Sequence, residues 1–152
     1  MRVIYAYVCL PLVLAWTPLG RQLMVSIGLS LIVGWGILVQ TVSFLFPVPR
    51  PYQKYKFIPV AGEGLFSDIE KRRDSFPSGH ITSLAIISML LFAYLPAAGV
   101  ISFIILILAS ASRVALGYHY VADMIGGIAI AYIVLFGLSI LGVFGFITSF
   151  IH

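Results

Sequence analysis

The sequence predicts an all-α fold, a polytopic bundle of membrane-spanning helices. Hydrophobic residues make up 61% and charged residues 9% of the 152 residues, and the mean hydropathy is +1.11, a composition too apolar for a soluble domain. The apolar residues gather in runs, and one helical crossing of a bilayer needs about 20 such residues. Backbone groups in hydrocarbon must be hydrogen-bonded within their own segment, so these runs are expected to be helices. We expect residues 1–152 to form one membrane-embedded domain.

Five apolar segments follow when the chain is divided at prolines, glycines and charged residues. Their approximate ranges are residues 3–16, 23–46, 81–95, 97–116 and 121–150. The first segment is short, but no clear small-residue cleavage site follows it, so we interpret it as a retained helix and not as a signal peptide. Tight turns are expected at residues 17–20 and at Pro96.

The long polar connection covers residues 47–76 and holds six of the nine Lys and Arg residues and four of the five acidic ones. Connections of this length are usually functional or disordered. Within it, Ser67 can cap a short amphipathic helix near residues 65–73, which is typical of a segment lying at the membrane interface. Ordinary flanking charges and aromatic residues explain the same pattern about equally well.

Ionisable residues at membrane depth are costly, so they usually face a cavity or one another. Apart from the polar connection, the two N-terminal arginines Arg2 and Arg21, and the last residue, His152, they occur inside or beside the apolar segments at four positions: His80, Arg113, His119 and Asp123. All four lie near predicted helix ends. Because successive helices cross the membrane in opposite directions, these ends are expected to meet on one face, together with Arg50.

These residue types suit a phosphate group. Residues 77–80, Pro-Ser-Gly-His, are expected to begin a helix with Pro77 at its first position, so that the following backbone N–H groups face an anion at the positive end of the helix dipole. Gly79 lets a ligand approach the backbone closely. Arg50 and Arg113 carry planar donor forks that match phosphoryl oxygens.

His119 and Asp123 are four residues apart and therefore share one helical turn. The carboxylate can hold one imidazole nitrogen and leave the other free to attack an electrophile. A histidine at a helix end is also often only a capping residue, and a His–Asp pair at this spacing is often only a structural contact. The single Cys9 has no Cys or His neighbours at ligand spacing, so no metal site is predicted.

Together these residues resemble the signature motifs of the type 2 phosphatidic acid phosphatase (PAP2) family, also called lipid phosphate phosphatases. Residues 77–80 resemble the second motif, and Ser112-Arg113, five residues, His119, three residues and Asp123 resemble the third. Arg50-Pro51 resembles the end of the first motif, which in the family is Lys, six residues, then Arg-Pro. Ser43 stands here in place of that lysine.

The resemblance covers about residues 43–123 and implies a metal-independent phosphatase, without a cofactor, that works through a phosphohistidine. It implies that His119 is the nucleophile, that Asp123 orients it, and that His80 protonates the leaving oxygen and then activates water. Four further positions are implied to bind the phosphoryl oxygens: Arg113, Arg50, Ser78 and Gly79.

The resemblance also implies a lipid substrate that keeps its chain in the bilayer. Bacterial relatives of this size act on phosphatidylglycerophosphate, undecaprenyl diphosphate or the 1-phosphate of lipid A. Basic residues of the polar connection are candidate contacts to a headgroup with several anionic groups: Lys54, Lys56, Lys71, Arg72 and Arg73. Three of these lysines, Lys54, Lys56 and Lys71, are candidates to replace the cation that is missing from the first motif.

Membrane orientation gives two conflicting indications. Most Lys and Arg residues lie on the face that carries the motifs, which by the positive-inside rule predicts a cytoplasmic site. The resemblance implies the periplasmic face of a bacterial inner membrane, and we favour it because the basic residues have a substrate to bind. Many family members have six helices, so five or six are expected.

Other classes fit parts of the sequence. A small channel or transporter could also place His, Arg and Asp at helix ends, and a purely structural membrane subunit could have the same hydropathy. Neither class accounts for the joint spacing of the motifs. A structural relative with weakened catalysis is kept as a further alternative. Soluble haloperoxidases have related motifs but not this apolar composition. The modest net charge of +4 suits a membrane surface or a phosphate better than nucleic acid, and no protein partner is implied.

Overall fold

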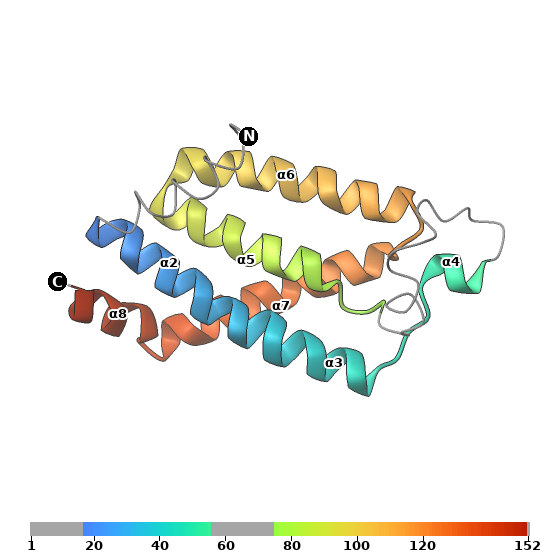
Figure 1. The fold of residues 1–152 in the computed structure, drawn as a ribbon, viewed down its shortest axis with the longest axis horizontal. Coiled ribbons are helices and arrows are strands. Elements are labelled where there is room, and N and C mark those ends of the chain that lie inside the picture. The colour runs from blue at the N-terminus through green and yellow to red at the C-terminus, as the bar shows by residue number, and fades with distance from the viewer. Residues whose placement is uncertain (1–16, 56–74, 152) are drawn as a thin grey trace, which may run out of the picture.

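The computed structural model describes residues 17–55 and 75–151, and in these ranges every regular element is a helix (Figure 1). The predicted all-α membrane bundle is therefore confirmed. The predicted first segment, residues 3–16, and the short interfacial helix near residues 65–73 lie outside the described residues.

The first described helix is one continuous run of 28 residues, Pro18–Leu45. It consists of α2 (Pro18–Leu31), a wider π-helical stretch η1 (Ile32–Val39) and α3 (Gln40–Leu45). The prediction of a tight turn at residues 17–20 was wrong: Thr17 is the N-cap of α2, and the helix already begins at Pro18. Its hydroxyl accepts a hydrogen bond from the Gly20 N–H at 3.0 Å, and Pro18 occupies the first turn, where its missing N–H is not needed.

Helices α5 (Gly79–Tyr94) and α6 (Pro96–Ala115) form a hairpin with Leu95 between them, so the turn expected at Pro96 is confirmed. The two helices approach very closely beside Gly99. A Cβ atom added at this glycine would lie 2.3 Å from the Phe92 Cα, so any larger residue would force the helices apart.

The last predicted segment, residues 121–150, is two helices and not one. Helix α7 (Val121–Ile140) ends at a turn in which Gly142 has a φ of +69°, and α8 (Val143–Ile151) follows. The left-handed conformation is accessible to glycine at little cost and commonly ends a helix. The hydrophobic run continues through Gly142, so hydropathy alone did not show the break.

Three described helices are long and apolar enough to cross a membrane: Pro18–Leu45, Pro96–Ala115 and Val121–Ile140. Helix α5 is also apolar but has only 16 residues. It packs against α6, α7, α2 and η1, and its side chains Ile81, Ala85 and Ile86 are fully buried in the core. Helix α6 exposes apolar side chains along its length, which suits contact with lipid.

The two ends of the bundle differ in composition. At one end, the end of α3, the starts of α5 and α7 and the end of α6 lie near the one-turn helix α4 (Pro51–Lys54) (Figure 1). Backbone hydrogen bonds join these segments, from the Ser75 N–H to the Val48 carbonyl (3.0 Å) and from the Tyr52 N–H to the Gly117 carbonyl (3.2 Å). We call this end, which carries the residues of the three motifs, the motif end.

Candidate active site

His119 is buried at the motif end, in the turn between α6 and α7, with 4% of its surface exposed. Its Nδ1 atom lies 2.9 Å from the Ser75 carbonyl oxygen and 3.3 Å from Asp123 Oδ2. Both neighbours are hydrogen-bond acceptors, so the hydrogen of a neutral ring belongs on Nδ1 and Nε2 keeps its lone pair. The arrangement can therefore present Nε2 to an electrophile.

Asp123 is nearly fully buried, with 2% exposure. Its Oδ2 atom accepts a hydrogen bond from the Ser75 hydroxyl at 2.6 Å and another from the Tyr120 N–H at 2.8 Å, in addition to its contact with His119. The bond from Tyr120 arises because Asp123 lies in the first turn of α7, where backbone N–H groups have no helical partner. These donors compensate for burying the carboxylate.

The turn before His119 is set by the way α6 ends. Gly117 has a φ of +69°, and its N–H donates to the Val114 carbonyl at 3.0 Å. The next two N–H groups, of Tyr118 and His119, donate to the Arg113 carbonyl at 3.0 and 3.4 Å. These bonds hold His119, just before α7, close to Arg113 on the last turn of α6.

The start of α5 differs from the expectation in two ways. The helix begins at Gly79 with Ser78 as its N-cap, so Pro77 precedes the cap and does not occupy the first helical position. The Ser78 N–H donates to the Asp123 carbonyl at 3.2 Å and is therefore not one of the free donors that the sequence predicted. The Ser78 hydroxyl, in contrast, is buried without a hydrogen-bond partner among the described residues.

Close packing fixes this helix start. A Cβ atom at Gly79 would lie 2.8 Å from Trp35 Nε1, and one at Gly127 would lie 3.0 Å from the Ser78 carbonyl oxygen. Glycine at these positions lets η1 and α7 lie directly against the first turn of α5. The backbone N–H groups of that turn consequently have a fixed direction.

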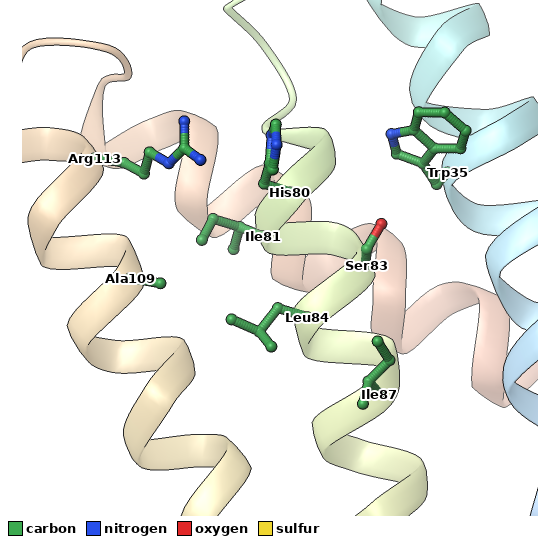
Figure 2. A pocket seen from close by; sticks show the side chains of 8 residues that line it. All are labelled: Trp35, His80, Ile81, Ser83, Leu84, Ile87, Ala109 and Arg113. Carbon is green, nitrogen blue, oxygen red and sulfur yellow. The ribbon is translucent and has the colours of Figure 1, made fainter. Parts of the chain in front are cut away.

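His80 is exposed and lines a cavity of about 500 Å³. Figure 2 shows the Arg113 guanidinium extending from α6 toward the His80 ring on α5. The Arg113 side chain also lies over the Tyr118 ring, 5.9 Å from its centroid. Arg50, at the start of α4, and His119, between α6 and α7, also lie at the motif end.

Arg50 is the N-cap of α4, and its N–H donates to Gln53 Oε1 at 3.0 Å. Ser43, at the position of the family lysine, donates its hydroxyl to the Phe76 carbonyl at 3.2 Å and so has a structural contact in this chain. Lys54 Nζ lies 5.5 Å from the centre of the Tyr55 ring. Lys56, Lys71, Arg72 and Arg73 lie outside the described residues.

No group of three or more His, Cys, Asp and Glu residues within ranges 17–55 and 75–151 could hold a metal ion. The sequence reasoning missed Ser75, which contacts both His119 and Asp123 and is fully buried. It also missed Trp35, which lines the cavity. Neither residue carries a charge or stands in a spacing pattern that would have marked it.

The fold and the clustered residues define a class, all-α membrane proteins with histidines and arginines gathered where several helix ends meet. The family follows from comparison with known proteins. The chain matches the model of the PAP2 superfamily over residues 20–144 and belongs to this superfamily, which confirms the resemblance seen in the motifs.

The chain is also similar to lipid A 1-diphosphate synthase of Escherichia coli (strain K12), with 31% identity over 112 residues. The similar region covers 71% of this chain and 47% of the relative, so the chain spans about half the length of that curated protein. No solved structure matched the chain. Superfamily membership and this relative support a membrane protein of a lipid phosphatase family.

Proposed function

We propose that this protein is an integral-membrane lipid phosphatase in which His119 receives the phosphoryl group of a lipid phosphate and passes it to water. The observation that carries the proposal is the pair of acceptors, the Ser75 carbonyl and Asp123, on either side of His119 Nδ1. They direct the lone pair to Nε2, and a nucleophilic histidine needs that tautomer.

The first step forms a bond between His119 Nε2 and phosphorus and breaks the bond between phosphorus and the lipid oxygen. The ring becomes positively charged as it attacks, and the buried Asp123 carboxylate stabilises that charge. His80 gives a proton to the departing oxygen, which is otherwise a poor leaving group. In the second step water attacks phosphorus and passes a proton to His80, the N–P bond breaks, and inorganic phosphate leaves.

The phosphoryl oxygens are assigned to Arg113, Arg50, the Ser78 hydroxyl and the Gly79 amide. Arg113 lines the cavity together with His80, and Arg50 is the N-cap of α4 at the same end of the bundle. The Ser78 hydroxyl is a buried donor without a partner among the described residues. Preorganised donors of this kind stabilise the charge that develops on the oxygens in phosphoryl transfer. Because Ser43 supplies no cation, we expect weaker phosphate binding than with a lysine there.

The cavity supports a lipid substrate. From His80 and Arg113 it continues along α5 past the apolar residues Leu84 and Ile87 (Figure 2), so a phosphate at the top would place its chain beside apolar side chains. The relative's name supports the 1-phosphate region of lipid A as one substrate. Phosphatidylglycerophosphate and undecaprenyl diphosphate fit the same chemistry, and Lys54, Lys71, Arg72 and Arg73 are assigned to a headgroup with several anionic groups.

A second candidate is transfer of the phosphoryl group to a lipid phosphate instead of water. It is favoured by the name of the relative from Escherichia coli, lipid A 1-diphosphate synthase. The phosphohistidine would be the same in both reactions, and only the second acceptor would differ. Labelled phosphate recovered in a product lipid, and not as inorganic phosphate, would select this candidate.

The test is release of inorganic phosphate by purified protein from a panel of lipid phosphates in detergent, with a chelator present. We expect activity that survives the chelator, is inhibited by vanadate and is lost in His119→Ala. The matched control is His152→Ala, which removes the C-terminal histidine. Full activity in His119→Ala would exclude the phosphohistidine, and absence of activity on every lipid would favour a channel, a transporter or an inactive relative.

We also propose that the motif end faces the periplasm of a bacterial inner membrane and that residues 1–152 act as one domain. Cysteine labelling tests the orientation in a Cys9→Ala background. Tyr55→Cys lies at the motif end and Arg21→Cys at the opposite end of the bundle, and both positions are exposed. An impermeant maleimide should label only Tyr55→Cys in spheroplasts, and the reverse pattern would place the site in the cytoplasm.

A further inference from the structure

The cavity beside His80 has two polar groups that the proposed reaction does not use. Most residues that line it are apolar, among them Leu84 and Ile87. His80 and Arg113 form the phosphate end of the cavity, where the proposed reaction places the phosphate. The two remaining polar groups are the Trp35 indole N–H and the Ser83 hydroxyl. These two groups come from different helices, η1 and α5.

Both groups lie next to the phosphate end. Ser83 follows His80 by three residues, which places it about 4.5 Å further along the axis of α5. Figure 2 shows its hydroxyl on the side of α5 that faces Trp35. The indole nitrogen lies beside Gly79, because a Cβ atom there would be 2.8 Å from Trp35 Nε1. The Trp35 side chain is 49% exposed, so a ligand can reach it.

The chemistry of the pair specifies its ligand. The indole N–H is only a donor, and the serine hydroxyl can donate as well. In a mainly apolar cavity within a membrane, few water molecules compete for such donors, so an acceptor oxygen on a ligand would bind them favourably.

We propose that Trp35 and Ser83 bind the carbonyl oxygen of an acyl chain and thereby make the protein selective for lipid phosphates with ester- or amide-linked chains. This inference rests on the proposed function, which places the phosphate beside His80 and Arg113. In an acylated lipid a carbonyl follows the phosphate after a few covalent bonds, at the depth of Ser83. A polyprenyl phosphate or diphosphate has no carbonyl and leaves both donors without a partner.

The experiment compares dioctanoyl phosphatidic acid with its ether-linked analogue, which has the same chain length and lacks only the carbonyl oxygens. The readout is the ratio of kcat/KM for the ester to that for the ether. One hydrogen bond between neutral groups corresponds to a preference of about 2- to 10-fold, and we expect that preference in the unchanged protein. The ratio should fall towards one in Trp35→Phe, which keeps the ring, and in Ser83→Ala.

Leu84→Ala is the matched control, because Leu84 lines the same cavity but has no donor. It should weaken both lipids alike and leave the ratio as it is in the unchanged protein. A ratio of one in the unchanged protein, or a ratio unaffected by both Trp35→Phe and Ser83→Ala, would overturn the inference while leaving the phosphatase intact. If Trp35→Phe does not fold, Ser83→Ala decides. Absence of phosphate release from every lipid would instead overturn the proposed function.

Discussion

The motif end and the opposite end of the bundle both use polar side chains to join helices, but they use them differently. At the opposite end, the Gln22 amide on α2 donates to the Tyr94 hydroxyl on α5 and to the Thr148 hydroxyl on α8. The Thr148 hydroxyl in turn donates to the Phe144 carbonyl at 2.8 Å. Every group in this cluster is neutral, and its hydrogen bonds join α2 to α5 and α8.

At the motif end the polar groups are charged or have bonding capacity left. The Ser78 hydroxyl is buried without a partner among the described residues, and His119 is held at Nδ1 so that Nε2 is directed elsewhere. Two buried serines, Ser26 and Ser30, also lack partners there, but they lie in α2, which carries none of the charged residues of the motif end. Unused hydrogen-bonding capacity therefore indicates a site only where charged groups accompany it.

The sharpest test of this contrast is Asp123→Asn, which keeps the shape of the side chain and removes its charge. We expect kcat to fall by about 10³-fold or more, because the imidazolium formed on attack loses its buried counterion and the amide can favour the wrong tautomer. Steady-state phosphate release measures the effect. A fall of less than about 10-fold would mean that Asp123 has only a structural role at the motif end.

Ser75→Ala should have the next largest effect. It removes the donor that lies 2.6 Å from Asp123 Oδ2 but keeps the carbonyl that contacts His119. A hydrogen bond to a charged group contributes about 1.5–3 kcal/mol, so kcat should fall by roughly 10- to 100-fold with little change in KM. Ser75→Thr, which keeps a hydroxyl, should recover part of the rate. A rise in KM with unchanged kcat would contradict a positioning role.

Ser43→Lys is expected to have a smaller effect and in the opposite direction. It restores the cation of the first motif and removes the hydrogen bond to the Phe76 carbonyl. If the added charge reaches the phosphate, KM should fall by about 2- to 10-fold, as for one partly exposed ionic contact. Ser43→Gln is the uncharged control of similar length. An equal result for the two variants would mean that charge at this position does not act on the substrate.

The sequence predicted which charged residues meet at the motif end, but it did not predict their contacts or the exact ends of the helices. Ionisable residues are so costly in a membrane that their positions alone indicated where His80, Arg113, His119 and Asp123 gather. Ser75 escaped notice because its role comes from a backbone carbonyl and a short contact, and neither leaves a pattern in the sequence. The break at Gly142 was missed because hydropathy does not register a backbone angle, and the start of α2 because a capping threonine resembles a turn residue.

The smallest effect on activity is expected at the opposite end. Gln22→Leu removes both hydrogen bonds of the amide, to Tyr94 and to Thr148, and should lower the free energy of unfolding by about 1–2 kcal/mol, since one such bond between membrane helices contributes about 0.6 kcal/mol on average. Thr148→Val breaks the bond to α8 alone and should cost about half as much. Thermal unfolding in detergent measures the stability of both variants. At a temperature well below Tm, kcat should stay within about 2-fold of the unchanged protein, because no group near His119 is altered.

A large loss of kcat in a folded Gln22→Leu protein would show that the two ends are coupled through α5, which contributes Tyr94 at one end and His80 at the other. In that case the neutral cluster would belong to the catalytic machinery and not only to the scaffold.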